Sequence, residues 1–347
     1  MVAVPGGDDD TYRAEETVRL TDLTSCGGCA AKWGASLLGE LLSAVPAGDG
    51  DDGLLVGLAP SDDAAVARLA DGVALVSTTD FFPPLVDDPA DYGAIAAANA
   101  CSDVFAMGGD VVLALNIAAF PESLPVPIIQ AIFRAAAEVV ADAGGVVAGG
   151  HTIRSPEPIF GLAVQGVVTP GEQFATGGAR PGDVLVLSKP LGTGLALASG
   201  DGGVVAAAVA SMRRLNRVAA DALRGRRDQV HAVTDVTGFG LLGHGWEMAE
   251  RSGARLVFEA EWLPLLDGVE SLAAAGIRTG GDARNRDYVS GHVELVADDA
   301  STTIGFDPQT SGGLLAAVEP AAADELAAAG FVEVGRVVAG KAGVRLG

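Results

Sequence analysis

The chain has 347 residues, which is long enough for two domains that each bury their own core. Apolar residues make up 49% of it but aromatic residues only 5%, and no uninterrupted apolar stretch reaches the roughly 18 residues of a membrane span. The formal net charge of −23 argues against nucleic acid and anionic membranes as partners, because their phosphate groups would be repelled.

The cysteines and the amino-terminal residues favour a cytoplasmic protein. Residues 1–10 are rich in Gly and Asp and carry no basic region followed by an apolar core, so we expect no secretory signal. Three unevenly placed cysteines, Cys26, Cys29 and Cys101, do not make a disulfide framework. We therefore expect reduced thiols.

In chain order, the sequence predicts a flexible segment followed by two domains. Residues 1–22 are polar, contain glycine and show no periodicity, so we expect them to be flexible. A polar connection that begins at Pro170 and Gly171 places the boundary between a domain at 23–170 and a domain at 171–347.

Helices and strands alternate in both domains without a strict βαβ rhythm. We therefore expect parallel and antiparallel pairing together, in an α/β or α+β fold. The expected helices span residues 33–45, 89–107, 125–143, the stretch up to about 198, 204–223 and 238–251, and the expected strands span 54–58, 64–69, 73–77, 111–119, 146–148, 159–169, 184–188 and 255–259.

The segment Thr24-Ser-Cys-Gly-Gly-Cys-Ala-Ala-Lys32 places a thiol three residues before an ammonium group. A nearby cation lowers the pKa of a thiol and favours the nucleophilic thiolate, so Cys29 is a candidate nucleophile and Lys32 a candidate phosphate ligand. Cys26 and Cys29 also form a Cys-x-x-Cys pair, which occurs in zinc sites and redox pairs. A loop of this composition is equally typical of a solvated terminal segment.

Aspartates stand at or near the ends of several predicted elements, and one lies four residues after Asn99 on the helix 89–107, so that both face one side. Each alone is typical of a helix cap or a turn. Together they suit Mg²⁺, which prefers carboxylate oxygens and bridges to substrate phosphates. These aspartates are Asp62, Asp63, Asp80, Asp103 and Asp235.

The sequence contains neither a GxxxxGK[ST] loop nor a GxGxxG after a strand, so the two common nucleotide cradles are missing. A nucleotide site would then depend on metal ions and backbone amides. Gly149, Gly150 and His151 follow the short strand 146–148 and supply such amides. His151 is equally typical of an ordinary polar turn residue.

Seven motifs, in this order and at ordinary spacing from about Arg19 onward, closely resemble the selenophosphate synthetase (selenide, water dikinase) family. This family belongs to the aminoimidazole ribonucleotide synthetase-like superfamily. The Cys-x-x-Lys loop and the Ser-Thr-Thr-Asp-Phe-Phe motif point to the selenium family within it. The motifs are Cys29-Ala-Ala-Lys32, Ser61-Asp-Asp-Ala-Ala-Val66, Ser77-Thr-Thr-Asp-Phe-Phe82, Ala98-Asn-Ala-Cys-Ser-Asp-Val-Phe-Ala-Met-Gly-Gly109, Gly149-Gly-His151, Thr234-Asp-Val-Thr-Gly-Phe-Gly-Leu-Leu-Gly-His244 and Asp307-Pro-Gln-Thr-Ser-Gly-Gly-Leu314.

The resemblance implies a fold, a partner and a reaction. Two α/β domains are expected, the first of which binds ATP, carries the catalytic loop and forms a β-barrel with its mate across a homodimer. The expected reaction converts ATP, selenide and water into selenophosphate, AMP and orthophosphate, with more than one Mg²⁺ in each site.

The resemblance also implies the roles of individual residues. Cys29 and Lys32 match the catalytic residues, and three aspartates, Asp63, Asp103 and Asp235, match the Mg²⁺ ligands. The residues that match ATP contacts are Lys32, Pro60, Ser61, Asp62, Asp80, Asp103, Gly149, Gly150 and His151.

Two positions depart from the family pattern. Many members carry a second cysteine where this chain has Ala31, so a dithiol role would fall to Cys26. An arginine often precedes the aspartate pair, and Ser61 in its place removes one cation from the nucleotide site.

Three alternatives remain at this point. One is another ATP-using member of the superfamily, a thiamine-monophosphate kinase-like or purine-pathway synthetase-like enzyme, against which the Cys29–Lys32 loop argues. The second is a carrier like the hydrogenase-maturation protein, which uses a carboxy-terminal cysteine, whereas this sequence ends Val-Arg-Leu-Gly347. The third is a redox or metal-binding module built on Cys26 and Cys29.

Overall fold

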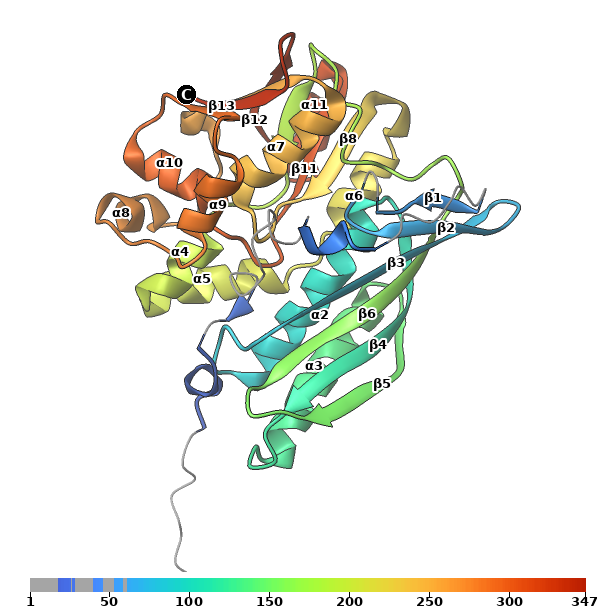
Figure 1. Ribbon diagram of the computed structural model, residues 1–347, viewed down its shortest axis with the longest axis vertical. Coiled ribbons are helices and arrows are strands. Elements are labelled where there is room, and N and C mark those ends of the chain that lie inside the picture. The colour runs from blue at the N-terminus through green and yellow to red at the C-terminus, as the bar shows by residue number, and fades with distance from the viewer. Residues whose placement is uncertain (1–17, 26, 29–39, 46–52, 59–60) are drawn as a thin grey trace, which may run out of the picture.

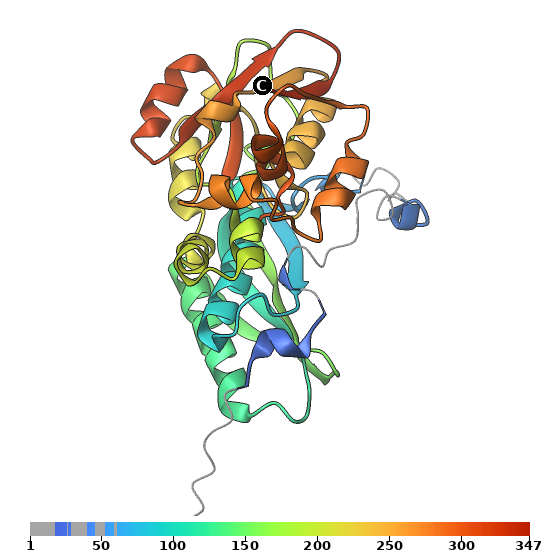
Figure 2. The same cartoon turned by 90° about the vertical axis from the view of Figure 1, so that its left-hand side faces the viewer.

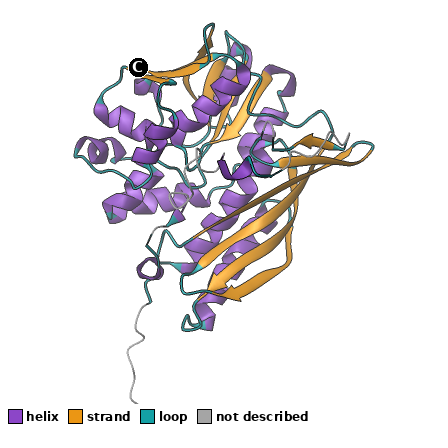
Figure 3. Ribbon diagram, viewed as in Figure 1, coloured by secondary structure: helices purple, strands orange, loops and turns teal. Residues whose placement is uncertain are grey.

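The computed structural model describes residues 18–25, 27–28, 40–45, 53–58 and 61–347. The amino-terminal elements form the lower part of Figure 1 and the carboxy-terminal elements the upper part, and both parts mix helices and strands (Figure 3). The first part contains η1 (Leu20–Leu23), β1 (Leu54–Val56), β2 (Ala65–Ala70), β3 (Val73–Phe82), α2 (Pro89–Ala106), β4 (Asp110–Phe120), α3 (Val126–Asp142), β5 (Val146–Arg154) and β6 (Ile159–Val168).

The first sheet has the strand order β1-β2-β3-β6-β4-β5, and β4 and β5 are its parallel pair. Helices α2 and α3 pack on one face of it (Figures 1 and 2). Along β3, Ala74, Val76 and Phe82 point into that core, while Val73 and Phe81 on the opposite face are 40% and 49% exposed. The sheet therefore has one covered face and one open apolar face.

Helix α2 begins where its sequence predicts and is buried on most of its circumference. The Asp88 side chain accepts a hydrogen bond from the Asp91 N–H at 2.9 Å, Pro89 occupies the first turn, and Gly108 at φ +70° ends the helix. Its alanine-rich surface allows close packing on two sides. One side meets β3 and β6, and another meets α5 (Gly202–Arg213), α6 (Arg217–Arg224) and β8 (Val230–Asp235) of the second part.

The second sheet has the order β10-β13-β9-β12-β7-β11-β8, with β13 parallel to β10 and to β9. The second part contains β7 (Val184–Leu187), α4 (Thr193–Ser199), α5 (Gly202–Arg213), α6 (Arg217–Arg224), η3 (Arg227–Gln229), β8 (Val230–Asp235), α7 (Gly240–Ser252), β9 (Arg255–Phe258), η4 (Ala260–Trp262), α8 (Val269–Ala274), α9 (Asp282–Tyr288), β10 (Val293–Leu295), α10 (Asp299–Phe306), β11 (Leu314–Val318), α11 (Pro320–Ala327), β12 (Val332–Val338) and β13 (Gly343–Leu346).

The prediction of an α/β fold with mixed strand pairing is confirmed, and three expected elements need correction. Strand β3 continues past residue 77 to Phe82, so Asp80 lies inside the strand. Strand β5 reaches Arg154, so residues 149–151 belong to a strand and not to a turn. The helix expected at 204–223 is broken before Asn216, whose side chain leaves the helix to bond Ser102 Oγ and the Gly312 carbonyl, each at 2.8 Å.

The end of the expected flexible segment also differs from the prediction. Residues 20–23 form the 3₁₀ helix η1, and Leu20 is fully buried. The Thr21 N–H and hydroxyl both donate to the Asp87 carboxylate, at 3.0 and 2.6 Å. Within the described stretches 18–25, 27–28, 40–45, 53–58 and 61–347, no helix is both long and apolar enough to cross a membrane. Most of the helix expected at 33–45 lies outside these stretches.

Candidate active site

Three of the aspartates singled out in the sequence converge where the two sheets meet. Asp63 precedes β2, Asp103 is on α2, and Asp235 is the last residue of β8. The Thr234 hydroxyl donates to Asp63 Oδ1 at 2.9 Å. Burial raises the pKa of Asp63 well above its ordinary value, and the negative charges of Asp235, Asp62 and Asp103 raise it further. The fold therefore brings like charges together in a partly desolvated place.

This carboxylate cluster fits a divalent cation. The Oδ2 atom of Asp63 is buried and has no hydrogen-bond partner among the described residues. A cation would satisfy this oxygen and relieve the repulsion that raises the pKa. The described part of the chain contains no group of three side chains already arranged as a metal centre. Water and phosphate oxygens would therefore complete the coordination, as is usual for Mg²⁺.

Hydrogen bonds between β3 and α2 orient Asp103 of the cluster and a further carboxylate, Asp80. The Thr78 hydroxyl donates to Asp103 Oδ2 at 2.5 Å, and the Asn99 amide donates to Asp80 Oδ2. Asp80 is 9% exposed and Asn99 is fully buried. Asn99 and Asp103 therefore share one helix face, as their spacing predicted, and that face carries the polar groups of the site.

Asp62 has a different role from its neighbour. Its carboxylate accepts from the Thr176 N–H at 3.0 Å, from the Thr176 hydroxyl at 2.7 Å and from the Asp63 N–H at 2.9 Å. Asp62 thereby ties the start of β2 to the connection between the two parts of the chain. Sequence analysis missed Thr176, because 114 residues separate it from Asp62.

The guanidinium of Arg251 lies beside Ser61, the position at which the resembled family often has an arginine. Arg251, in the last turn of α7, donates to Ser61 Oγ at 3.2 Å. A cation from the second part of the chain therefore lies beside Ser61. The sequence carries no local signal for this pairing, which spans 190 residues.

The segment Gly149–His151 is not brought to the carboxylates within one chain. It lies on β5, the edge strand, separated from β3 by β6 and β4. Gly150 has φ +149°, and a Cβ there would lie 2.2 Å from the Asn116 carbonyl oxygen, so only glycine fits. All three residues are exposed.

Cys29 and Lys32, the predicted catalytic residues, lie outside the described residues, as do Cys26 and Pro60. The segment just before the loop is held in place. The Gly28 N–H donates to the Pro83 carbonyl at 3.0 Å, and Gly28 packs against Leu85 and Thr310. The third cysteine, Cys101, is buried in α2, and burial raises the pKa of its thiol to about 12. Cys101 is therefore no nucleophile.

The motif that begins at Asp307 forms a second polar centre, which sequence analysis did not assign. Asp307 Oδ2 accepts from the N–H groups of Gly194 and Leu195, at 3.1 and 3.2 Å, and from Gln309 Nε2 at 3.0 Å. Burial raises the pKa of Asp307 to about 7. Gln309 Oε1 in turn accepts from Gly192 and Thr193, so these two side chains hold the start of α4.

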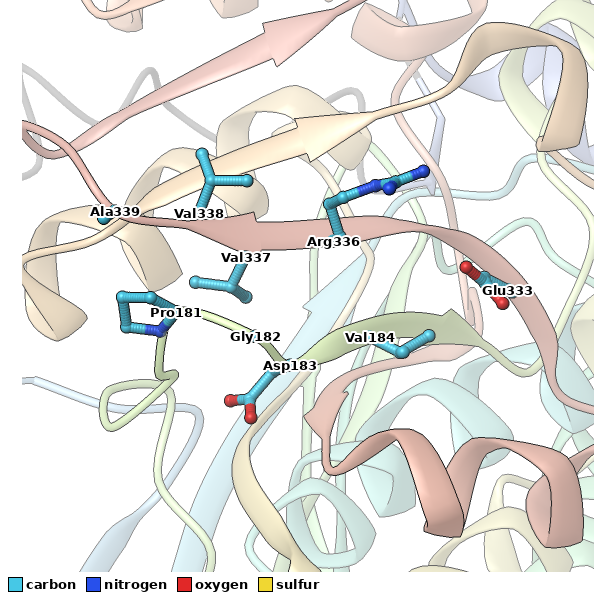
Figure 4. Close-up of a pocket in the computed structure, with 9 residues that line it drawn as sticks. All are labelled: Pro181, Gly182, Asp183, Val184, Glu333, Arg336, Val337, Val338 and Ala339. Atoms are coloured by element: carbon cyan, nitrogen blue, oxygen red, sulfur yellow. The ribbon is translucent and has the colours of Figure 1, made fainter.

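A surface hollow at the start of β7 lies away from the cluster (Figure 4). Its carboxylate Asp183 contacts the His231 Nδ1 atom at 2.9 Å. In the sheet register, Val318 of β11 pairs with Val184 and Val230, while Leu314 pairs with Asp235. Asp183, just before β7, therefore lies at one end of this group of neighbouring strands, and Asp235, the last residue of β8, lies at the other end. The hollow is not part of the site.

Two family models match the chain one after the other. "AIR synthase related protein, N-terminal domain" matches residues 61–168, and "AIR synthase related protein, C-terminal domain" matches residues 180–346. Solved structures share this two-part architecture. AaThiL complexed with AMPPCP and TMP gives a TM-score of 0.67 at 20% identity, over 95% of this chain and 96% of that chain. Hydrogenase maturation protein HypE in complex with ATP gives 0.59 at 20% identity, over 83% and 85%.

Two curated relatives are much more similar in sequence. "Selenide, water dikinase" of Myxococcus xanthus (strain DK1622) is 43% identical over 346 residues, which are 96% of this chain and 98% of that protein. "Selenide, water dikinase" of Burkholderia pseudomallei (strain K96243) is 49% identical over 325 residues, 89% of each chain. The match extends through both sheets and the carboxylate cluster between them. The chain therefore belongs to the selenide, water dikinase family, built on the two-domain AIR synthase-related fold.

Proposed function

We propose that the protein makes selenophosphate from ATP, selenide and water and releases AMP and orthophosphate. The observation that carries this proposal is the convergence of Asp63, Asp103 and Asp235 in a chain 43% identical, over 96% of its length, to a selenide, water dikinase. Phosphoryl transfer depends mainly on positioning and charge neutralisation, and a cluster of carboxylates that binds cations supplies both. A cytoplasmic location, inferred from the cysteines, is part of the proposal.

Asp63, Asp103 and Asp235 are proposed to hold more than one Mg²⁺. When bound, Mg²⁺ neutralises the phosphates, whose charge of about −4 on ATP would otherwise be repelled by the aspartates. Asp63 contributes the buried oxygen that has no donor among the described residues, and Thr234 fixes the orientation of the same carboxylate. Thr78 does the same for Asp103.

The proposed nucleotide site combines described and undescribed residues. Asp80, held by Asn99, and Ser61, beside Arg251, lie on the elements that carry the cluster. Asp62 acts there by fixing the start of β2. Lys32 and Pro60 complete the residues proposed to contact ATP. Lys32 and Cys29 are proposed to act on the phosphoryl group that is transferred. Hydroselenide is already an anion at neutral pH, so Cys29 and Lys32 deliver and shield it and need not deprotonate it.

A homodimer is part of the proposal. Val112 and Leu115 on β4 lie 48% and 38% exposed on the open apolar face of the first sheet. A second copy packed there would close the two sheets into a barrel and cover this face. Because β5 is far from β3 in its own chain, the second copy is also the way in which Gly149–His151 would reach a bound nucleotide.

Oligomeric state tests the dimer directly. Leu115→Arg places a charge on the open sheet face, and Val218→Arg places the same charge on α6, where Val218 is 69% exposed. We expect light scattering to give a monomer for Leu115→Arg and a dimer for Val218→Arg and the unchanged protein. If the unchanged protein is a monomer, the proposed homodimer is wrong.

Phosphorus NMR of the products tests the reaction. With Mg-ATP and selenide we expect selenophosphate and AMP in equal amounts, and no selenophosphate when selenide is omitted. Cys29→Ser should abolish this signal, while Cys26→Ser serves as the paired control and should be milder. Formation of ADP alone, or phosphorylation of added thiamine monophosphate, would overturn the proposed function in favour of a small-molecule kinase.

A further inference from the structure

Lys189 is a buried lysine whose Nζ atom lies within hydrogen-bond distance of three oxygen atoms. It follows β7, is 3% exposed, and its Nζ donates to the Arg214 carbonyl at 2.5 Å, the Ser311 carbonyl at 2.8 Å and Ser311 Oγ at 3.5 Å. An ammonium has three donors, and three acceptors meet them. Burial lowers the pKa of Lys189 to about 7, while the charge of Asp235 acts in the opposite direction.

The acceptor residue Ser311 has an unfavourable backbone conformation. Its φ is +48°, and within the described ranges it is the only residue other than glycine with a positive φ. Such a conformation persists only where its surroundings hold it. Lys189 holds the Ser311 carbonyl and hydroxyl from one side, and the next carbonyl, that of Gly312, accepts from Asn216 at 2.8 Å.

The same turn reaches the first domain. The Ser311 N–H donates to Asn99 Oδ1 at 2.7 Å, and the other end of that amide donates to Asp80. An amide that accepts at its oxygen and donates at its nitrogen has its orientation fixed. A continuous chain of hydrogen bonds thus runs from Lys189 through Ser311 and Asn99 to Asp80.

We propose that Lys189 is a positioning residue of the nucleotide site, which holds the Ser311 turn so that Ser311 can fix the Asn99–Asp80 pair across the domain boundary. Without the ammonium, the buried carbonyl and hydroxyl of Ser311 and the part-buried Arg214 carbonyl lose this donor, and the turn relaxes from its left-handed conformation. Asn99 then loses the N–H that orients it, and Asp80 loses its fixed amide partner. This inference rests on the proposed role of Asp80 in ATP binding.

A double-mutant cycle separates positioning from general stability. Lys189→Met keeps the length and removes the donors, and Asn99→Ala removes the connecting amide. If Lys189 acts through Asn99, the double variant should bind Mg-ATP no more weakly than either single variant, each about tenfold weaker than the unchanged protein. Lys341→Met is the matched control on an exposed lysine and should change nothing. Effects of Lys189→Met and Asn99→Ala that add fully would overturn the proposal.

A second pair of variants tests the turn without touching the ammonium. Ser311→Gly removes the hydroxyl but accepts a positive φ, whereas Ser311→Val removes the same hydroxyl and resists that φ. We expect nearly unchanged Mg-ATP affinity for Ser311→Gly and a loss of about tenfold for Ser311→Val. If Lys189→Met does not fold, the two Ser311 variants still test the proposal. Equal Mg-ATP affinities of Ser311→Gly and Ser311→Val would overturn it.

Asp80→Asn distinguishes failure of this inference from failure of the proposed site. If Asp80→Asn weakens Mg-ATP binding and Lys189→Met does not, only the positioning role is wrong. If the unchanged protein and Asp80→Asn bind Mg-ATP equally well, the nucleotide site itself is misassigned, and the positioning role falls with it.

Discussion

Asp63 and Asp307 both have a raised pKa, and each has one buried carboxylate oxygen without a hydrogen-bond partner among the described residues. Their surroundings differ. Asp307 accepts from two backbone N–H groups and from Gln309, and these hydrogen bonds partly offset the cost of burying its carboxylate. Asp63 has one hydroxyl donor and three neighbouring carboxylates that repel it.

The comparison separates a structural carboxylate, Asp307, from a proposed cation ligand, Asp63. A buried carboxyl group that accepts hydrogen bonds from the protein orders local structure, here the start of α4. A buried charge placed among like charges destabilises the empty fold and is explained by a ligand of opposite sign. A high pKa alone would not have separated the two residues, whereas the identity of their partners does.

The largest expected effect is that of Asp63→Asn. Removing one negative charge should lower selenophosphate formation by about a hundredfold or more, because the cation loses a ligand. The same change should raise the melting temperature of the metal-free protein, because it relieves repulsion. Product NMR and calorimetry measure the two effects, and Asp71→Asn in the exposed turn before β3 is the control. If both activity and stability fall, Asp63 has a structural role like that of Asp307.

Asp307→Ala should instead act on stability. The N–H groups of Gly194 and Leu195 and the Gln309 amide lose their acceptor, at a cost of about 2–3 kcal/mol in the free energy of unfolding. Asp307→Asn keeps an acceptor oxygen and should cost much less. Urea unfolding checks the difference. Equal stability of the alanine and asparagine variants would show that the carboxylate does not hold α4.

The pH dependence of stability sharpens the comparison further. Burial raises the pKa of Asp307 from 3.8 to about 7, so its contribution to stability is full below pH about 3.8 and is lost as the pH rises to about 7. Metal-free Asp307→Asn should therefore lose less stability than the unchanged protein across this window. Melting temperatures in chelator at a series of pH values test this. Parallel curves for the two proteins would contradict it.

The smallest effect is expected for Asp62→Asn. Although Asp62 adjoins Asp63, its oxygens already accept from Thr176 and from the Asp63 N–H, so it resembles Asp307 more than its neighbour. An asparagine retains one acceptor, and we expect a loss below about 1 kcal/mol in stability and below about tenfold in Mg-ATP affinity. Calorimetry that found an effect as large as that of Asp63→Asn would make Asp62 part of the cation site.

Sequence reasoning predicted most elements of the first domain because their signals are local. Asp88 and Pro89 start α2, Gly108 ends it, and alternating side chains mark the strands. It misplaced Asp80 because β3 carries polar residues in its second half, where tertiary pairing with β6 extends the strand. The break before Asn216 depends on partners more than 90 residues away, which no local pattern encodes.

The sequence predicted the acidic residues of the candidate site, but it did not predict the residues that hold them in position. Their spacing predicted that Asn99 and Asp103 share one helix face. The motifs and their order led to the hypothesis that Asp63 and Asp235 belong to one Mg²⁺ site. Thr176 and Lys189 carry no motif of their own, and they matter only through contacts between distant parts of the chain.

The burial of Cys101 makes this chain convenient for covalent labelling. Because burial raises the pKa of the Cys101 thiol to about 12, the thiol stays protonated at pH 7, and alkylating reagents should leave it unmodified in the folded protein. Intact-mass spectra of the alkylated native protein then report on Cys26 and Cys29 alone. A third added mass would mark molecules in which α2 has opened, so one reagent measures both loop chemistry and unfolding.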